Sequence, residues 1–167
     1  MRTEMKYTVF HTPAGWIGLL ASGAGLRATT LPQPTAEASL ALLGREAAPA
    51  EMDPGAFAGL IDRFQAYFTG ERVAFDDRLD LSAGTPFQQA VWAATRRIGY
   101  GETRTYRWVA GEAGRPLGAR AVGQALGANP LPLVVPCHRV IGSDGGLAGF
   151  GGGLGMKRYL LNLEQGG

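Results

Sequence analysis

Cysteine and histidine are scarce in this chain, whose 167 residues include one cysteine, Cys137, and two histidines. A single cysteine cannot form an internal disulfide, and without a Cys-x-x-Cys pair a dithiol redox cycle is excluded. One cysteine and two histidines are too few for a structural zinc site, so we expect no metal. No apolar run reaches the about 18 residues that span a bilayer, and the start, MRTEMKYTVF, lacks the apolar core of a secretory signal. We therefore expect a soluble protein of the reducing cytoplasm, without a membrane partner.

Charge is distributed unevenly along the chain. The net charge of +2 combines −3 over residues 1–85, with seven Lys/Arg and ten Asp/Glu, and +5 over residues 86–167, with nine and four. A basic half favours an anionic partner, nucleic acid first, although so modest an excess also arises by chance. The segment LSAGTP separates the two halves. We expect an N-terminal unit over residues 1–80 and a C-terminal unit over residues 81–167.

The N-terminal half has the pattern of a small α/β unit. Residues 5–31 read as short strands, because two apolar runs flank SGAG, a hairpin signal with glycines where positive φ is needed. Residues 35–43 look helical, and residues 57–69 carry apolar side chains at helical spacing before Gly70. Residues 73–81 favour an edge strand. We find no catalytic constellation here, and the acids read most simply as a solvated surface: Asp62, Asp76, Asp77 and Asp80.

The C-terminal half is expected to be mostly helical. Thr85 is a good helix start, with Pro86 at the first helical position and Gln88 placed to close a capping box. Further on, residues 105–130 contain two helical patterns on either side of AGRP, a short turn with glycine. This is the layout of a helix-turn-helix.

The second helix of this motif has two unlike faces when residues are placed every ~100°. The apolar half contains Leu117, Ala121, Val122, Ala125 and Leu126. The other half is nearly bare and carries one long cation: Ala119, Arg120, Gly123 and Gln124. Such a face suits close approach to a grooved partner into which Arg120 reaches. It equally suits packing on another helix with Arg120 in solvent, and the segment leaves both interpretations open.

The thiol lies in NPLPLVVPCHRVIG, residues 129–142, directly before His138 and Arg139. Cationic neighbours favour the thiolate, so the expectation is a lowered pKa for Cys137. Because consecutive residues on a helix do not face each other, His138 would act indirectly, through a water, with a third group to orient it. Glu164 on the last helix is a candidate. The alternative is an inert cysteine buried in the core.

Glycine is concentrated in GGLAGFGGGLG, residues 145–155. The segment follows no clear strand and lacks the Lys-Ser/Thr of a phosphate-binding loop, so we expect no nucleotide cofactor and, with no other cofactor motif present, no cofactor at all. It reads either as a flexible loop or as a backbone that approaches a flat ligand closely.

Together these motifs closely resemble the O6-alkylguanine-DNA alkyltransferases. The resemblance runs from about Thr85 to Glu164 and rests on FQQAVW, the TY of residues 105–106, ARAVG of residues 119–123, and NPLPLVVPCHRVIG. The spacing of PCHRV from ARAVG and NP is highly specific, whereas the N-terminal half matches only in general layout. The resemblance implies a ribonuclease-H-like α/β N-terminal lobe without catalytic duty. It also implies a mostly α, winged-helix-like C-terminal lobe with a helix-turn-helix.

The activity implied by the resemblance is DNA repair by direct reversal. The alkyl group of O6-alkylguanine, and of O4-alkylthymine, would pass to Cys137 in one irreversible turnover. His138 would take the thiol proton through a water, Glu164 would orient His138, and Asn129 would brace the turn beneath. Tyr106 would press on the phosphate of the target nucleotide and donate a hydrogen bond to the leaving guanine.

The partner implied is double-stranded DNA, bound through its minor groove by a monomer. Arg120 would fill the gap left by the flipped base, on a helix whose small residues suit a narrow groove. The resemblance assigns the DNA-contacting role to Arg120, Tyr106, Ala119, Gly123 and Gln124. It assigns the substrate pocket, where main-chain carbonyls near Cys137 and Val140 read the guanine edge, to Val140, Phe150, Gly151 and Pro132.

The chain departs from the family pattern at Phe150-Gly151, where Tyr-Ser is usual. Two hydroxyl groups are lost, and the pocket is expected to be roomier and to favour bulkier adducts. The zinc ligands that some relatives carry in the N-terminal lobe are also missing. Two alternatives remain: a non-catalytic lesion-binding or regulatory DNA-binding protein, and a hydrolase using Cys137 and His138, whose adjacency rarely gives the geometry a Cys–His pair needs.

Overall fold

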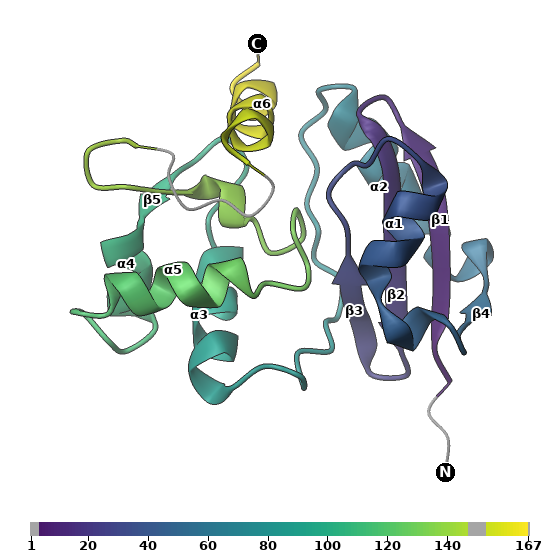
Figure 1. Ribbon diagram of the computed structural model, residues 1–167. Helices are drawn as coiled ribbons and strands as arrows, with labels where there is room; N and C mark the ends of the chain where they lie inside the picture. Colours follow the sequence, from purple (N-terminus) through teal and green to yellow (C-terminus); the bar gives the residue numbers. More distant parts are fainter. Residues whose placement is uncertain (1–3, 147–152, 167) are drawn as a thin grey trace. The chain divides into compact units, whose positions relative to one another are not determined.

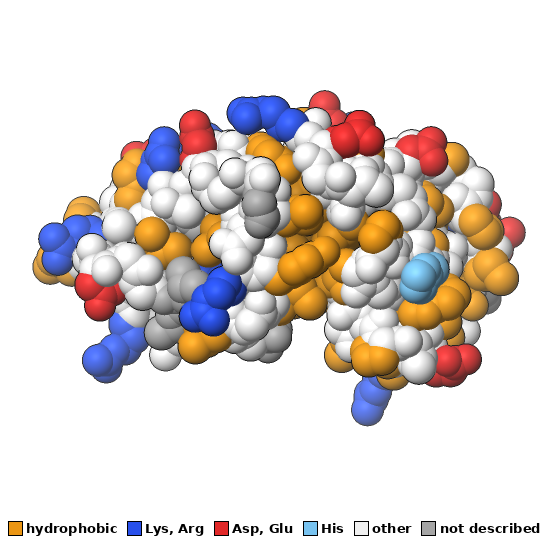
Figure 2. Space-filling view, turned by 90° about the horizontal axis from the view of Figure 1, so that it is seen from above, with side chains coloured by type: hydrophobic (Ala, Val, Ile, Leu, Met, Phe, Trp, Pro, Cys, Tyr) orange, Lys and Arg blue, Asp and Glu red, His pale blue; other side chains and the backbone are white. Residues whose placement is uncertain are grey.

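The computed structural model describes residues 4–146 and 153–166 and divides into two compact units, Met1–Leu81 and Ser82–Gly167 (Figure 1). On the face seen in Figure 2, basic side chains lie mostly on the C-terminal unit and acidic side chains mainly on the N-terminal unit. Phe150 and Gly151 lie outside the described residues.

A four-stranded sheet organises the N-terminal unit, whose elements are β1 (Lys6–Thr12), β2 (Gly15–Ser22), β3 (Gly25–Thr29), α1 (Ala36–Leu43), η1 (Arg45–Ala47), β4 (Glu51–Met52), η2 (Pro54–Phe57) and α2 (Ala58–Phe68). The strand order is β3-β2-β1-β4, with β1–β2 and β2–β3 antiparallel and β1–β4 parallel. Ser22 pairs with Gly25 across the second hairpin, which confirms the turn expected at SGAG.

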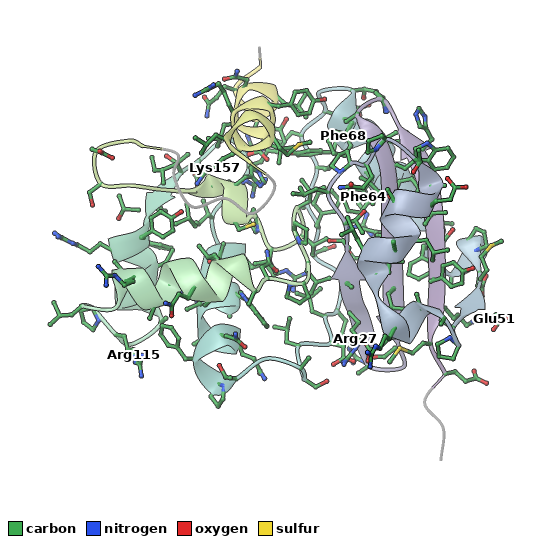
Figure 3. The ribbon with its side chains drawn as sticks, viewed as in Figure 1. Arg27, Glu51, Phe64, Phe68, Arg115 and Lys157 are labelled. Atoms are coloured by element: carbon green, nitrogen blue, oxygen red, sulfur yellow. The ribbon has the colours of Figure 1, made fainter. Side chains whose placement is uncertain are left out.

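The two helices cover opposite faces of this sheet (Figure 1). Successive side chains of a strand point to opposite faces. Phe10 of β1 therefore meets Phe64 of α2, with ring centroids 5.9 Å apart, on one face (Figure 3). On the other face Leu20 of β2 packs with Leu43 of α1. Gly18 permits this close approach, because a Cβ there would lie 3.0 Å from Leu43 Cδ1.

The edge strand expected over residues 73–81 is almost absent. Only Leu79 forms a bridge, with Leu26 of β3. The backbone of β3 is held there by Leu26 N–H donating to Arg78 O at 2.9 Å. The side chain of Phe75 instead packs on Phe64 of α2, with ring centroids 4.6 Å apart. The segment therefore packs on α2 and does not continue the sheet.

Two of the acids expected in solvent are paired. Asp80 accepts hydrogen bonds from Ser22 Oγ at 2.5 Å and Arg27 Nη1 at 3.1 Å, and its side chain is 9% exposed. Asp77 binds the guanidinium of Arg63 through two contacts, at 2.6 and 2.8 Å. The prediction of a solvated acidic surface is therefore wrong for these two residues. Sequence spacing gave no sign of partners so far along the chain.

Three packed helices form the base of the C-terminal unit, whose elements are α3 (Pro86–Arg96), β5 (Arg104–Thr105), α4 (Tyr106–Glu112), α5 (Ala119–Gly127), η3 (Cys137–Arg139), β6 (Val140–Ile141) and α6 (Leu154–Glu164). The capping box is confirmed: Gln88 N–H donates to Thr85 Oγ1 at 3.1 Å, and Thr85 N–H to Gln88 Oε1 at 2.9 Å. The indole Nε1 of Trp92 on α3 donates to Ala125 O on α5 at 2.8 Å, which ties these helices together.

Helices α4 and α5 flank the AGRP turn and confirm the helix-turn-helix. On α5, Val122, Ala125 and Leu126 are buried as expected. Leu117 is fully exposed, which contradicts its expected place in the apolar half. Because α5 begins at Ala119, Leu117 precedes the helix and does not follow its periodicity.

Candidate active site

The short parallel pair β5–β6 brings two distant segments together. Arg104 pairs with Val140 and Thr105 with Ile141. Tyr106 directly follows β5, and Thr105 caps the helix that it begins by accepting the N–H of Trp108 at 3.0 Å. Since β6 directly follows η3, the pairing places Tyr106 beside the segment that carries Cys137.

Asn129 holds the turn that precedes the thiol. Its Nδ2 donates to Val135 O at 3.0 Å, and its Oδ1 accepts the N–H of Leu131 at 2.9 Å. The N–H of Cys137 donates to the same Val135 oxygen at 2.7 Å. Among the described residues Leu133 is the one non-glycine residue with positive φ, 77°. Backbone strain of this kind costs about 1–3 kcal/mol and persists only where the surroundings impose it.

Burial raises the pKa of the Cys137 thiol above its ordinary value. A side-chain hydrogen bond with Asn129, the charge of Lys157 and local N–H groups oppose this effect without cancelling it. The expectation that cationic neighbours lower the pKa of Cys137 is therefore wrong in direction, because desolvation disfavours the charged form. The resting group is a thiol, and it needs a base to lose its proton.

His138 is buried against Glu164. Its Nε2 lies 2.6 Å from Glu164 Oε2, while its buried Nδ1 has no hydrogen-bond partner among the described residues. Burial lowers the pKa of His138, although the hydrogen bond with Glu164 opposes the shift. Burial alone would raise the pKa of Glu164, but hydrogen bonds from His138 and Arg139 outweigh it and hold that pKa well below its usual range. A neutral imidazole facing a carboxylate carries its proton on Nε2, so Nδ1 presents a lone pair.

Arg139 anchors the carboxylate from the other side. Its Nε donates to Glu164 Oε1 at 2.8 Å and its Nη2 to Oε2 at 3.0 Å. Its Nη1 donates to Ile98 O at 2.7 Å, and Gly101 N–H also reaches Glu164 Oε1, at 3.2 Å. Sequence reasoning treated Arg139 only as a cation beside the thiol. Its main structural role is to fix the group that orients His138.

Lys157 is a buried cation that sequence reasoning missed (Figure 3). Its Nζ donates to Val140 O at 2.6 Å and lies 5.7 Å from the ring centroid of Tyr106. Burial lowers its pKa, and the charge of Cys137 opposes that shift. A signal was available, because Lys157, Leu160 and Glu164 lie at the helical spacing of one buried face.

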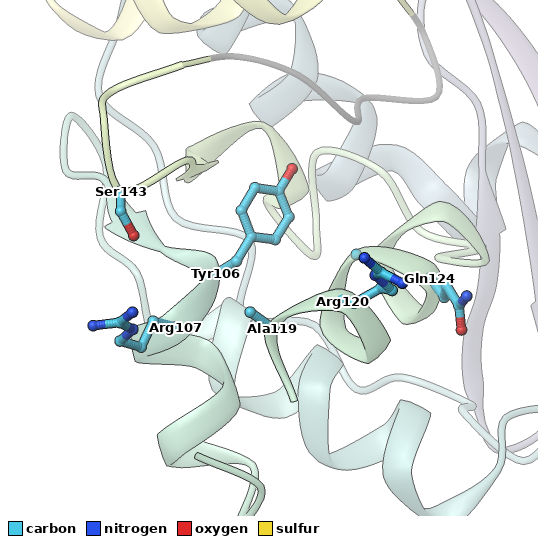
Figure 4. Close-up of a pocket in the computed structure, with 7 residues that line it drawn as sticks. Tyr106, Arg107, Ala119, Arg120, Gln124 and Ser143 are labelled. Atoms are coloured by element: carbon cyan, nitrogen blue, oxygen red, sulfur yellow. The ribbon is translucent and has the colours of Figure 1, made fainter. Parts of the chain in front are cut away.

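A pocket of about 570 Å³ opens in front of Tyr106 (Figure 4). It is lined by Tyr106, Arg107, Ala119, Arg120, Gly123, Gln124 and Ser143. Arg107 and Ser143 are the lining residues that sequence reasoning did not predict. Cys137 is not among the lining residues, but its charge contributes, after burial, to a raised pKa of Tyr106. Tyr106 therefore lines the pocket and lies within electrostatic reach of the thiol.

Known proteins resemble this chain in fold and in sequence. The model of the 6-O-methylguanine DNA methyltransferase DNA binding domain matches residues 86–166, and that of the ribonuclease-like domain matches residues 5–81. The chain belongs to the 6-O-methylguanine DNA methyltransferase family. The family model and the sheet with its flanking helices confirm the expected ribonuclease-like α/β N-terminal lobe and helical C-terminal lobe.

Individual members of the family are similar to this chain over most of its length. The methylated-DNA–protein-cysteine methyltransferase of Mycobacterium bovis is 57% identical over 113 residues, which are 68% of each chain. That of Methanosarcina barkeri is 50% identical over 103 residues, 62% of this chain and 65% of its own. The crystal structure of Mycobacterium tuberculosis OGT in complex with DNA matches with a TM-score of 0.82 and 45% identity, over 96% of this chain and 93% of that one.

Two other residues predicted for the substrate pocket, Val140 and Pro132, do not line the pocket beside Tyr106. Val140 is fully buried, and its carbonyl oxygen accepts the hydrogen bond from Lys157. Pro132 is half-buried and bridges to Val135, but does not line the pocket beside Tyr106. The predicted roles of Phe150 and Gly151 fall outside the described residues.

Residues 4–146 and 153–166 contain no group of three or more His, Cys, Asp or Glu side chains placed to hold a metal ion. Within the same ranges no helix is long and apolar enough to cross a bilayer.

Proposed function

We propose that this protein repairs alkylated DNA by moving the alkyl group from O6 of guanine to Sγ of Cys137. The observation that carries the proposal is the arrangement of His138: Nε2 is held by Glu164 at 2.6 Å, and the buried Nδ1 has no partner among the described residues. A buried lone pair beside the one thiol of the chain is suited to accept its proton.

The chemical step exchanges one bond for another. The thiol proton passes to Nδ1 of His138, through a bridging water, and the thiolate attacks the alkyl carbon in line. A sulfur–carbon bond forms as the bond between that carbon and O6 breaks, and the electron pair leaves with the guanine. The imidazolium of His138 then gives up a proton, and the leaving purine gains one, so the products are a thioether and guanine.

Tyr106 assists the leaving base in this proposal. Its hydroxyl donates a hydrogen bond to the guanine as negative charge develops on it. Burial and the charge of Cys137 raise the pKa of Tyr106, which keeps the phenol protonated and able to donate. The carbonyl of Val140, already fixed by Lys157 at 2.6 Å, keeps a second lone pair for the guanine edge.

The base must leave the duplex to reach the thiol, because its target atom is stacked inside the helix. We propose that α5 enters the minor groove and that Arg120 fills the gap left by the flipped nucleotide. The pocket supports this assignment, since Arg120, Ala119 and Gly123 line it together with Tyr106. The small side chains let the helix backbone come close to the sugars.

Each protein molecule acts once in this proposal. The product is a thioether, which water does not hydrolyse, and the chain has no second thiol to remove the alkyl group. Every group in the mechanism comes from one chain, so a monomer is sufficient. We propose that it acts in the cytoplasm. We extend the proposal to O4-alkylthymine, whose alkyl group is also carried by an exocyclic ring oxygen.

The test is the intact mass of the protein after incubation with a duplex that contains one O6-methylguanine. The expected result is a gain of one methyl group, located on Cys137 by peptide mapping and saturating at one per protein. Cys137→Ser is the matched control and should bind the duplex without gaining mass. Binding without transfer by the wild type would support a lesion reader instead, and neither binding nor transfer would end the proposal.

A further inference from the structure

A second cation lies at the mouth of the pocket, across from Arg120. Arg107 is exposed and lines the pocket together with the exposed Ser143. Figure 4 shows its guanidinium on the side of Tyr106 opposite Arg120 and pointing away from the Tyr106 ring. Arg107 is therefore directed to the surface beside the pocket.

The pairing of β5 with β6 explains why Arg107 and Ser143 line the same pocket. Thr105 pairs with Ile141 in the parallel β5–β6 pair. Arg107 and Ser143 each follow this pair by two residues, so the two segments bring a guanidinium and a hydroxyl to the same pocket. The β5–β6 pair is held next to Cys137, since β6 directly follows the turn that carries this residue.

The charge of Arg107 has no partner among the residues that the structure describes. Neither Arg107 nor Arg120 forms an ion pair or a hydrogen bond with any described side chain. The acids of the C-terminal unit are engaged elsewhere. Glu112 pairs with Arg97 at 2.7 Å, Glu102 lies 3.7 Å from Arg104, and Glu164 is buried in the active site.

Asp144 follows Ser143 but is turned into its own loop. Its Oδ1 accepts the N–H of Gly146 at 2.8 Å. No acidic side chain lines the pocket among the described residues. Two guanidinium groups without a partner among the described residues, and one hydroxyl group, therefore line the pocket.

We propose that Arg107 and Ser143 form a binding site for a backbone phosphate of the DNA strand next to the lesion. A guanidinium and a hydroxyl are both donors, which suits phosphate oxygens, and such contacts fix the register of a protein on DNA without reading sequence. The site rests on the proposed function, because it presumes that the duplex is the ligand. It would hold the DNA strand on one side of Tyr106, while Arg120 enters the DNA duplex on the other side.

Salt dependence separates a phosphate contact from other roles. Each phosphate contact contributes about 0.9 to the slope of log affinity against log salt concentration on duplex DNA. Arg107→Gln should therefore reduce the magnitude of this slope by about one and weaken binding equally for intact and O6-methylguanine duplexes. Ser143→Ala should weaken both duplexes but leave the slope unchanged, because a neutral hydroxyl releases no counterion.

The matched control is Arg158→Gln. Arg158 lies on α6, is exposed, does not line the pocket and has no described ion pair, so the variant loses the same charge at another place. Binding is measured by fluorescence anisotropy between about 50 and about 200 mM salt, the range over which several phosphate contacts change affinity strongly. The slope of Arg158→Gln should equal that of the wild type.

Three outcomes decide the matter. A slope reduced in Arg107→Gln alone supports the phosphate site. An unchanged slope overturns it, as does a loss confined to a duplex whose adduct carries a carboxylate, which would make Arg107 a reader of the adduct. Wild-type methyl transfer to Cys137 is scored separately by mass, so failure of the phosphate site and failure of the proposed function are distinguishable.

Discussion

His138 and Glu164 meet through Nε2 and Oε2 at 2.6 Å in a buried site. The same carboxylate binds Arg139 through two further hydrogen bonds. This second partner keeps Glu164 ionised, and an ionised Glu164 keeps the imidazole proton on Nε2. The pair thus fixes both the orientation and the tautomer of His138, and it leaves Nδ1 without a described partner, as the proposed role of base requires.

The transfer rate should persist below the pH at which an ordinary histidine protonates. Burial lowers the pKa of His138 below 6.5, and only the neutral imidazole accepts a proton. Single-turnover rates measured from about pH 5 to about pH 9 should therefore stay level through pH 6.5 and fall only at lower pH. Far-ultraviolet circular dichroism at each pH shows that the fold is intact. A rate already halved at pH 6.5 would contradict this arrangement.

Glu164→Gln should impair both stability and transfer. The change leaves Arg139 buried without its carboxylate, which costs about 3 kcal/mol in the free energy of unfolding. It also frees His138 to take the wrong tautomer, so the rate should fall by at least about 100-fold. Urea unfolding and single-turnover kinetics measure the two effects. Glu102→Gln, at an exposed position 3.7 Å from Arg104, is the control and should change neither.

The sign of the pH effect on stability is fixed by the lowered pKa of Glu164. A carboxylate whose folded pKa is depressed contributes stability above its unfolded pKa and loses it as the pH falls. The difference in the free energy of unfolding between the wild type and Glu164→Gln should therefore be largest above pH 4.5 and shrink below it. A difference that grows in acid would show that Glu164 is protonated in the fold.

Local signals predicted local structure well. The cap at Thr85 and the turn at SGAG were confirmed because each depends on residues within a few positions of one another. The same holds for the apolar face of α5, with the exception of Leu117. Periodicity applies only inside a helix, and the sequence did not mark where α5 begins.

Long-range pairing could not be predicted in the same way. Glu164 was a candidate partner of His138, but its bond to Arg139 depends on how α6 packs. The pKa of Cys137 was predicted in the wrong direction because charged neighbours are visible in a sequence and burial is not. Lys157 was missed for the same reason, since its role depends on being buried beside Tyr106.

The raised pKa of Cys137 predicts a thiol that reacts slowly with small alkylating reagents at neutral pH. The midpoint of labelling by iodoacetamide should lie above the ordinary value of 9.0, because burial disfavours the thiolate. Lys157→Met should raise this midpoint further, since the charge of Lys157 opposes the shift. Arg158→Met, the next residue on α6 and exposed, should leave it unchanged. Equal midpoints in the wild type and Lys157→Met would show that Lys157 has only a packing role.

Gly123→Ala should separate the needs of the fold from those of DNA binding. A Cβ at Gly123 would meet nothing nearer than Tyr106 Cε1 at 4.0 Å, so the fold has room for it. Alanine also favours a helix by about 0.8–1.0 kcal/mol over glycine. The melting temperature should therefore be unchanged or higher. Affinity for duplex DNA should fall, because the added methyl group projects into the pocket that we propose the minor groove covers.

Gly127→Ala is the matched control on the same helix. Its Cβ would meet no atom within 4 Å, and Gly127 does not line the pocket. Both variants gain the same methyl group on α5, so any difference in affinity reports the surface rather than helix propensity. Loss of binding in Gly123→Ala alone would place the small face of α5 against DNA. Equal affinity in both variants would mean that this face does not approach the duplex closely, and the proposed entry of α5 into the minor groove would then be wrong.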